Sequence, residues 1–289
     1  QNFRKPKRSD LPNLNHYAKL INGKAQSITV GYTEGTRGCK HICRHCPIVP
    51  VYNGRFFVVQ PDVVMEDIRQ QVEAGAEHIT FGDPDFFNGP GHALRLVESF
   101  HQEFPNLTYD VTIKVEHLLA HSEKLNLLAG TGCLFVTTAV EEVDDDVLCK
   151  LEKSHTRADF IEVVSATNAL ELTLSPTFIP FHPWTTTFGF VDLLSMISGL
   201  DLIENVAPVQ LGIRLLIPEG SRILELKEMN QFLGDFDAEK LSYSWKSADQ
   251  HVDELQSKVY EAIQLGVSES ASRREIFEKV WILAHNACE

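Results

Sequence analysis

The sequence feature that most constrains this chain is a group of three cysteines within eight residues. Cys39, Cys43 and Cys46 are spaced C-x3-C-x2-C and make up half of the six cysteines in the chain. Three thiolates at this spacing can point at a common centre from one tight loop. A [4Fe–4S] cluster normally takes four cysteine thiolates, so three leave one iron without a protein ligand. Such an iron can bind a small molecule, as a catalytic zinc ion with an open position does.

The same three cysteines are compatible with a zinc site or with a buried core. A zinc ion would need a fourth ligand, which His41 or His45 could supply. Free cysteines are also often buried in a protein core. Five basic residues lie among or beside the cysteines, and nearby positive charge favours thiolates; they are Arg37, Lys40, His41, Arg44 and His45. The pattern therefore favours a metal site over a hydrophobic core.

Length and charge narrow the class of protein. The 289 residues are enough for one large α/β domain or two small ones. The formal net charge of −14 disfavours a nucleic-acid partner, because binding phosphates needs a basic face. The short basic stretch at residues 4–8 is interpreted as a solvated arm. We expect no membrane partner and no signal peptide, since the chain lacks long apolar runs. Reduced thiols favour a cytoplasmic location.

Strand and helix patterns alternate after residue 26. The first expected strand, residues 27–33, is short and rich in β-branched residues, and the cysteine loop follows it directly. Further strands are expected at residues 78–81, 108–115, 133–140, 170–179 and 209–217. Helices are expected at residues 60–75, 92–103, 117–129 and 186–200, and through most of residues 219–286. A further helical region is expected to begin at the acidic cap formed by residues 144–146, because acidic side chains favour a helix N-terminus. This alternation implies right-handed βαβ units and a parallel sheet.

The cysteine spacing and its place after a strand resemble the radical S-adenosylmethionine (SAM) superfamily. In that superfamily the open iron binds the amino and carboxylate groups of SAM, and one electron from the cluster breaks a C–S bond. The resemblance covers residues 26–217 and implies an α/β fold, a partial (β/α)6 TIM-type barrel. We divide the remainder into an N-terminal arm, residues 1–25, and a helical C-terminal extension, residues 218–289. The implied cofactors are a [4Fe–4S] cluster and SAM.

Two of the strand ends resemble SAM-binding motifs of the superfamily. Residues 82–85, Gly-Asp-Pro-Asp, stand where the superfamily usually has Gly-Gly-Glu-Pro, which holds the SAM amino group. Asp83 or Asp85 could take that role, although a simple turn also accounts for these residues. Glu141 matches the glutamate of a Gly-x-Glu-Ser stretch, which binds the SAM ribose. Ala139 and Glu142 depart from that stretch, and an acidic helix start is the alternative.

Function collects at the C-terminal ends of the strands in barrels of this type. Arg214 lies among Ile and Leu, which is costly unless the SAM carboxylate, a substrate anion or Glu116 pairs with it. Lys114 and His182 are weaker candidates for ligand binding, because each could simply be a polar residue that is hydrogen-bonded within the protein. The candidate cofactor-binding residues are therefore His45, Gly82, Asp83, Asp85, Glu116, Thr138, Glu141 and Arg214. The candidate metal ligands are Cys39, Cys43 and Cys46.

The remaining cysteines are scattered and make no second cluster motif. Cys133 falls in a strand pattern, Cys149 in a helix, and Cys288 is the penultimate residue. The ending at residues 286–289 faintly resembles small radical SAM proteins with a Cys-Cys-Ala-Glu-Pro or selenocysteine-containing tail, although that pentapeptide is absent. Members of that group are associated with arsenic natural products. This resemblance implies a catalytic role for Cys288.

The sequence predicts an enzyme that cleaves SAM reductively to a 5′-deoxyadenosyl radical acting on a small molecule. One alternative is cleavage at the Cγ–S bond, with transfer of a 3-amino-3-carboxypropyl group to a small acceptor such as trivalent arsenic, which a Cys288 thiolate could present. A second alternative is a non-catalytic Fe–S or zinc protein. The resemblance implies an electron donor such as flavodoxin or ferredoxin as a partner.

Overall fold

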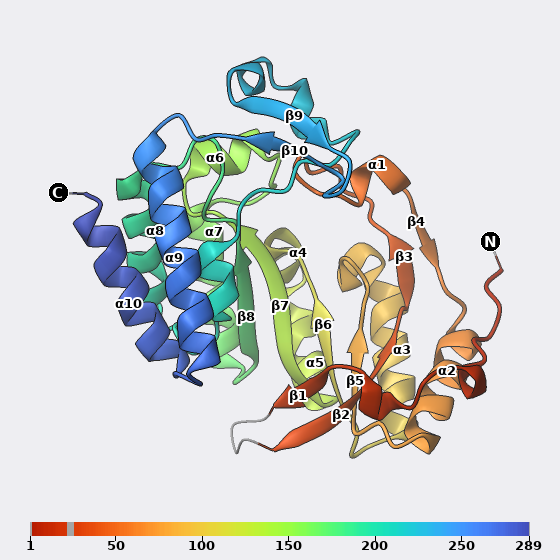
Figure 1. Cartoon of the computed structure of the whole chain (residues 1–289). Helices are drawn as coiled ribbons and strands as arrows, with labels where there is room; N and C mark the ends of the chain where they lie inside the picture. Colours follow the sequence, from red (N-terminus) through yellow and green to blue (C-terminus); the bar gives the residue numbers. More distant parts are fainter. Residues whose placement is uncertain (1, 22–25, 289) are drawn as a thin grey trace. The chain divides into compact units, whose positions relative to one another are not determined.

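The computed structural model describes residues 2–21 and 26–288. A six-stranded sheet has the order β1-β2-β5-β6-β7-β8 (Figure 1). The pairs β2–β5, β5–β6 and β6–β7 are parallel, and the short β1 is antiparallel to β2. The strands span Lys19–Ile21 (β1), Ser27–Thr33 (β2), His78–Phe81 (β5), Thr108–Thr112 (β6), Cys133–Glu141 (β7) and Thr173–Phe178 (β8). The predicted α/β class with a parallel sheet is confirmed.

The chain folds into two compact units. The first consists of Gln1–Lys40, Gly54–Thr138 and Ser165–Leu174, and the second of His41–Asn53, Ala139–Val164 and Ser175–Glu289. Strands β7 and β8 each begin in the first unit and end in the second.

Helices and a buried aromatic cluster accompany the parallel strands of the first unit. The helices are α2 (Pro61–Glu73), α3 (Pro90–Glu103), α4 (Val115–Ala120) and α5 (Leu125–Gly130). A small antiparallel pair joins β3 (Thr36–Gly38) to β4 (Phe56–Val58). Tyr109 of β6 packs edge-on against Phe81 of β5 and Phe100 of α3, with ring centroids 5.6 and 5.5 Å away. All three side chains are fully buried, so this cluster fastens α3 to the sheet.

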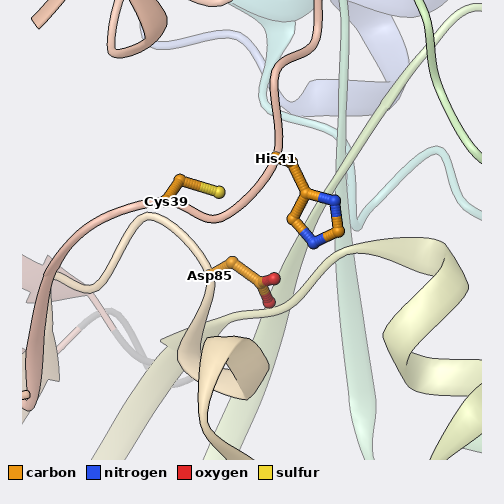
Figure 2. A group of neighbouring side chains, drawn as sticks. All are labelled: Cys39, His41 and Asp85. Atoms are coloured by element: carbon orange, nitrogen blue, oxygen red, sulfur yellow. The ribbon is translucent and has the colours of Figure 1, made fainter. Parts of the chain in front are cut away.

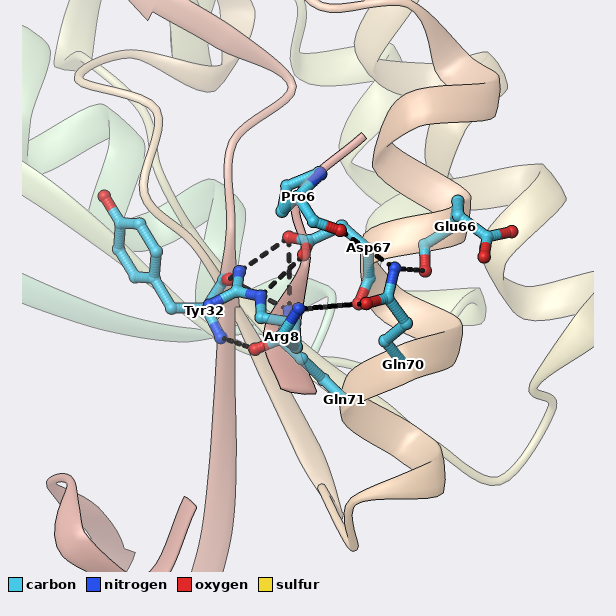
Figure 3. Close-up of polar contacts among 7 residues, drawn as sticks. All are labelled: Pro6, Arg8, Tyr32, Glu66, Asp67, Gln70 and Gln71. Atoms are coloured by element: carbon cyan, nitrogen blue, oxygen red, sulfur yellow. Dashed lines mark hydrogen bonds and ion pairs between the residues drawn. The ribbon is translucent and has the colours of Figure 1, made fainter. Parts of the chain in front are cut away.

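The N-terminal segment is held by α2 through a polar network (Figure 3). The Arg8 guanidinium donates to both carboxylate oxygens of Asp67, each at 2.7 Å, and to the carbonyl oxygen of Tyr32 at 2.8 Å. Gln71 also donates to the Tyr32 carbonyl oxygen. The interpretation of residues 4–8 as a solvated arm is therefore wrong for Arg8. The buried Asp67 needs a partner in the low-polarity interior, and Arg8 supplies it.

The second unit contains most of the C-terminal helices. They are α1 (Val49–Tyr52), α6 (Asp145–Lys150), the first part of α7 (Arg157–Ala169), α8 (Thr187–Gly199), α9 (Gln250–Ser268) and α10 (Arg273–Asn286). Asp144 caps α6 by accepting from the amides of Asp146 and Val147, as the acidic cap predicted. Ser272 and Glu275 form a capping box at the start of α10. A buried cluster that includes Leu215, Ile217 and Trp245 forms one core of this unit.

Four element predictions need correction. Residues 209–217 form a 3-10 helix, Pro208–Gly212, and one isolated bridge between Phe181 and Arg214 in place of a strand. Leu211, Leu215 and Ile217 are buried there without regular strand pairing, whereas Val209 and Leu216 are exposed, and sequence periodicity alone does not distinguish such a segment from a strand. The expected helix 117–129 is broken into α4, a 3-10 turn and α5. The expected arm contains β1, and the C-terminal extension contains a hairpin, β9 (Leu233–Asp237) with β10 (Ser242–Trp245).

Among the described residues, none of the helices is both long enough and apolar enough to cross a membrane.

Candidate functional site

The three clustered cysteines lie on the loop between β3 and α1. All three carry reduced thiols; Cys43 is buried, and Cys39 and Cys46 are half-buried. Burial raises the pKa of the Cys46 thiol, and the neighbouring Cys43 and Glu141 raise it further. The expectation that nearby bases favour the thiolate is therefore wrong for Cys46 in the metal-free chain. A bound metal deprotonates such a thiol outright, so three reduced thiols on one loop are donors that suit an iron–sulfur cluster.

Asn88, a buried residue that the sequence motifs did not reveal, holds the backbone on both sides of Cys39. Its Oδ1 accepts from the amide of Lys40, and its Nδ2 donates to the carbonyl oxygen of Gly38, both at 3.2 Å. The Cys39 sulfur lies 3.7 Å from the same Oδ1. Gly38 has a φ of +81°, which favours glycine at this turn. Asn88 therefore fixes the position of the first cysteine from the segment that follows β5.

Asp83 and Asp85 belong to this same segment after β5, and both are buried. Asp83 accepts from the Gly35 amide at 2.8 Å and from the Thr36 hydroxyl at 2.6 Å, one bond to each oxygen. Burial raises the pKa of Asp83 to about 6, although these hydrogen bonds lower it. The side chain thus ties the segment after β5 to the turn that leads into β3. Both of its oxygen atoms are used within the first unit.

Asp85 lies closer to the cysteine loop. Figure 2 shows Cys39 on the loop after β3 and Asp85 on the segment after β5, and the sulfur and a carboxylate oxygen lie within 4.8 Å of each other. Further contacts of Asp85 come from the start of α4: its carboxylate is 2.6 Å from His117 Nδ1 and accepts from the Lys114 amide at 3.4 Å. Glu116 pairs with the Lys114 ammonium at 2.9 Å. The first unit therefore collects buried charged groups beside Cys39.

Gly82 has a steric reason to be glycine. A Cβ at this position would lie 1.9 Å from the hydroxyl oxygen of Tyr32, far inside contact distance. The amide of Gly82 donates to the carbonyl oxygen of Thr33 at 2.8 Å. The chain after β5 therefore passes directly against the Tyr32 ring, which accounts for this residue without a ligand.

Glu141, at the end of β7, is the centre of a buried charge cluster in the second unit. Its Oε1 lies 3.0 Å from His45 Nε2 and 3.6 Å from Lys153 Nζ. Burial alone would raise the pKa of Glu141, but Lys153 and His45 lower it to about 2. Lys153 also donates to the carbonyl oxygen of Ala139 at 2.7 Å. Glu141 is thus a permanent carboxylate, held beside the cysteine loop by His45.

Two of the predicted cofactor contacts, His45 and Glu141, meet in this cluster. Lys153 was missed as a site residue, although it opens the Lys-x-His-Thr stretch that follows β7. Glu141 has a φ of +73°, a strained conformation for a residue with a side chain. The contacts of Glu141 with His45 and with Lys153 given above are both made through Oε1.

Three other residues predicted from the sequence are Thr138, Arg214 and Cys288. Thr138 is fully buried, and its hydroxyl has no hydrogen-bond partner among the described residues. Arg214 donates to Asp253 at 2.7 Å and to the carbonyl oxygen of Trp245 at 3.1 Å, and its guanidinium stacks on the Trp245 ring. The internal ion pair of Arg214 is therefore made with Asp253, while Glu116 pairs with Lys114. Cys288 follows α10 and is half-buried.

Comparison with known families identifies the superfamily. The sequence profile described as "Radical SAM superfamily" matches residues 33–186, more than half of the chain. The chain belongs to the radical SAM superfamily. Membership of this superfamily implies a [4Fe–4S] cluster, SAM, a reductant and a substrate. The matched residues begin at the end of β2 and include the cysteine loop, the segment after β5 and Glu141.

Three similar proteins place the chain within this fold. It is 23% identical over 176 residues to tRNA-2-methylthio-N(6)-dimethylallyladenosine synthase of Desulfitobacterium hafniense (strain Y51), covering 57% of this chain and 39% of that protein. The cobalamin-dependent SAM radical enzyme OxsB, with aqua-cobalamin and SAM bound, aligns with a TM-score of 0.68 at 13% identity over 82% of this chain and 41% of that chain. Methylornithine synthase (PylB) aligns with a TM-score of 0.54 at 14% identity, over 89% and 68%.

These likenesses support the fold and leave the reaction open. At identities of 13 and 14% the two structures show the fold alone, and they confirm the predicted α/β partial barrel with C-terminal helices. The chain spans less than half the length of the D. hafniense synthase and of OxsB. The activities named for those proteins are therefore not assigned to this chain.

Proposed function

We propose that the enzyme cleaves SAM at its C5′–S bond and that the resulting 5′-deoxyadenosyl radical acts on a small-molecule substrate. Cys39, Cys43 and Cys46 hold the [4Fe–4S] cluster, which supplies the electron when reduced. The cluster would offer one iron without a cysteine ligand, where the amino and carboxylate groups of SAM would bind. A donor such as flavodoxin or ferredoxin provides the electron, and a reducing compartment such as the cytoplasm keeps the thiols reduced.

The observation that carries this proposal is the ionised Glu141 carboxylate beside the cysteine loop. His45 and Lys153 contact Glu141 through Oε1, and we assign to Oε2 the hydrogen bond from a ribose hydroxyl of SAM. A carboxylate that stays charged makes a charge-assisted hydrogen bond, which is stronger than one between neutral groups. Anchoring the ribose in this way supports the pose of SAM that breaks the C5′–S bond, because positioning selects the reactive geometry.

Asp85 is the better candidate of the two aspartates for the SAM amino group because of its position, since both aspartates already contact neighbouring residues through their two oxygen atoms. Its carboxylate lies within 4.8 Å of the Cys39 sulfur, so it is close to the expected position of the open iron. Asp83 is already committed to Gly35 and Thr36, and we assign it the role of positioning β3. The orphan hydroxyl of Thr138 is a further candidate SAM contact. Gly82, Glu116 and Arg214 remain weaker candidates because neighbouring residues account for them.

A second candidate function rests on the structural role of Asp83. Asp83 is the first acidic residue of the segment expected to hold the SAM amino group, but its carboxylate binds Gly35 and Thr36 instead. The amino-acid part of SAM can then adopt a different position, in which the Cγ–S bond is the one that breaks. The enzyme would then be a transferase that moves a 3-amino-3-carboxypropyl group to a small acceptor. A trivalent arsenic species fits that acceptor, with Cys288 as its soft ligand.

Titration of SAM into the reconstituted protein tests the ribose contact. Glu141→Gln removes the charge while keeping the shape, and loss of a charge-assisted hydrogen bond costs roughly 1.5–3 kcal/mol, or about ten- to a hundredfold in affinity. Glu162→Gln, at an exposed position of α7, is the matched control and should bind SAM normally. The SAM-induced change in the EPR spectrum of the reduced cluster is the readout. Equal SAM affinity in the Glu141→Gln and Glu162→Gln proteins would mean that Glu141 does not contact the ribose.

A further inference from the structure

The second unit contains a further set of polar side chains, those of Glu142, His182 and Trp184, which the proposed SAM contacts do not use. Glu142 is the chain neighbour of Glu141. Glu142 directly follows β7, and His182 and Trp184 lie on the turn that follows β8. Glu142 and His182 are buried, and Trp184 is half-buried. Residues at the C-terminal ends of barrel strands are where ligands bind in this type of fold.

The orientation of the His182 ring is fixed by Glu142. Its Nε2 lies 3.0 Å from Glu142 Oε2, while Glu142 Oε1 accepts from the Val143 amide at 2.7 Å. A carboxylate only accepts, so the proton of a neutral His182 ring sits on Nε2 and donates to Glu142. The second ring nitrogen, Nδ1, is then a hydrogen-bond acceptor.

The turn that carries His182 and Trp184 is rigid. The His182 amide donates to the Thr185 hydroxyl oxygen at 2.9 Å, and that hydroxyl donates to the Pro180 carbonyl oxygen at 2.9 Å. The Trp184 ring packs against the hydrophobic core that contains Leu215 and Ile217. Both rings are therefore held in place before any ligand arrives, which lowers the entropic cost of binding.

Two buried nitrogen atoms on these rings have no hydrogen-bond partner within the described part of the chain. Among the residues that the structure describes, neither Nδ1 of His182 nor Nε1 of Trp184 makes a hydrogen bond. The ring centroids are 5.7 Å apart. Leaving a buried polar atom unpaired costs free energy, and a native protein usually satisfies it with protein, water or ligand. One nitrogen accepts and the other donates, so the two are chemically complementary to a hydroxyl group, which also both donates and accepts.

We propose that Glu142, His182 and Trp184 form a substrate subsite that binds a hydroxyl group of a small molecule. The hydroxyl donates to His182 Nδ1 and accepts from the indole N–H of Trp184. Glu142 acts as a positioning residue, because it selects the tautomer that leaves Nδ1 as the acceptor. The assignment of this subsite to the substrate rests on the proposed function, in which the neighbouring Glu141 holds SAM.

Indole NMR signals provide a direct test, because the chain has three tryptophans. The Trp245 indole N–H donates to the carbonyl oxygen of Leu215 at 2.8 Å and serves as an internal reference. The experiment uses reconstituted protein with 15N-labelled tryptophan, without SAM or reductant. The probes are 1-propanol and methyl ethyl ether, which have equal size, but only the alcohol can donate. Trp184→Phe assigns the signal, and Trp281→Phe is the matched control.

We expect 1-propanol to shift the Trp184 signal saturably, with a Kd on the order of 1–100 mM for so small a molecule. The ether should bind roughly tenfold or more weakly, because it leaves Nδ1 unpaired. His182→Gln keeps a donor to Glu142 but removes the Nδ1 acceptor, and should abolish the preference for the alcohol while the Trp245 signal is unchanged. If the His182→Gln protein does not fold, the 15N chemical shift of His182 Nδ1 is measured instead, in the Trp184→Phe protein. That shift should change when 1-propanol is added.

Three outcomes would overturn the subsite: no saturable shift with 1-propanol, an equal response to the ether, or an unchanged preference in the His182→Gln protein. A tightly held water at the two nitrogens would give the first of these. Since neither SAM nor an electron is involved, these results are independent of SAM cleavage. Failure of the proposed function would show only in SAM binding or product formation, with the alcohol still bound.

Discussion

Replacing Asp83 with Asn should change how the stability of the protein depends on pH. The Asp83 carboxyl group is 2% exposed and accepts hydrogen bonds from Gly35 and Thr36. Burial raises its pKa from the ordinary value of 3.8 to about 6. In Asp83→Asn, the amide oxygen can accept from the Gly35 amide and the NH2 group can donate to the Thr36 hydroxyl oxygen. The variant therefore keeps the contacts and loses the buried charge.

The sign and size of the effect follow from proton binding. Because the pKa of Asp83 is higher in the folded chain, the folded state binds its proton more tightly than the unfolded state between about pH 4 and pH 6. The stability associated with this proton is fully present below about pH 4 and is lost as the pH rises through 6. At about 1.4 kcal/mol per pKa unit, the difference between 3.8 and about 6 corresponds to about 3 kcal/mol.

The assay is urea unfolding of the iron-free, reduced protein from pH 4 to pH 7, followed by far-UV circular dichroism. Between these limits the free energy of unfolding should fall by about 2 kcal/mol more in the wild type than in Asp83→Asn, because the unfolded carboxyl is already partly ionised at pH 4. Asp62→Asn, at an exposed position of α2, is the control and should follow the wild type. Parallel pH curves for the wild type and Asp83→Asn would refute the reasoning, since they would mean that this carboxyl titrates normally.

Two further perturbations test the cluster ligands and the N-terminal contact. Cys43→Ala should leave a folded protein that retains little iron and lacks cluster absorbance, whereas Cys149→Ala, at an exposed thiol, should retain both; a full cluster in the first variant would contradict the assignment. Arg8→Met should lower the free energy of unfolding by roughly 3 kcal/mol, because it leaves the buried Asp67 charge without its partner. Arg69→Met breaks an exposed ion pair and should cost less than about 1 kcal/mol, so similar losses in urea unfolding would argue against this role of Arg8.

Local patterns were enough to predict most of the fold. The β-branched run at residues 27–33, the apolar stripe of residues 60–75 and the acidic cap at 144–146 each became the expected element. The run at residues 209–217 did not, because its apolar residues lie in an irregular segment that begins with the 3-10 helix Pro208–Gly212. The β9–β10 hairpin was missed, since its burial comes from packing on distant residues.

The candidate site was predictable where chemistry is concentrated in the sequence. The cysteine spacing and Glu141 could be found from short motifs. By contrast, the contacts of Asp83 and Asn88 join residues about 50 positions apart. No local sequence pattern therefore reveals that Asp83 positions the turn before β3 or that Asn88 supports the backbone around Cys39. The choice of Asp253 as the partner of Arg214 is likewise a product of tertiary packing.

The nucleoside product of SAM cleavage decides between the two proposed reactions. The reconstituted enzyme is reduced with dithionite under anaerobic conditions and mixed with SAM, and the nucleosides are separated by chromatography. The Cys43→Ala protein, treated in the same way, sets the background. We expect 5′-deoxyadenosine as the main nucleoside, formed only when the cluster is present. Methylthioadenosine as the main product would contradict the proposed C5′–S cleavage and establish the aminocarboxypropyl route instead.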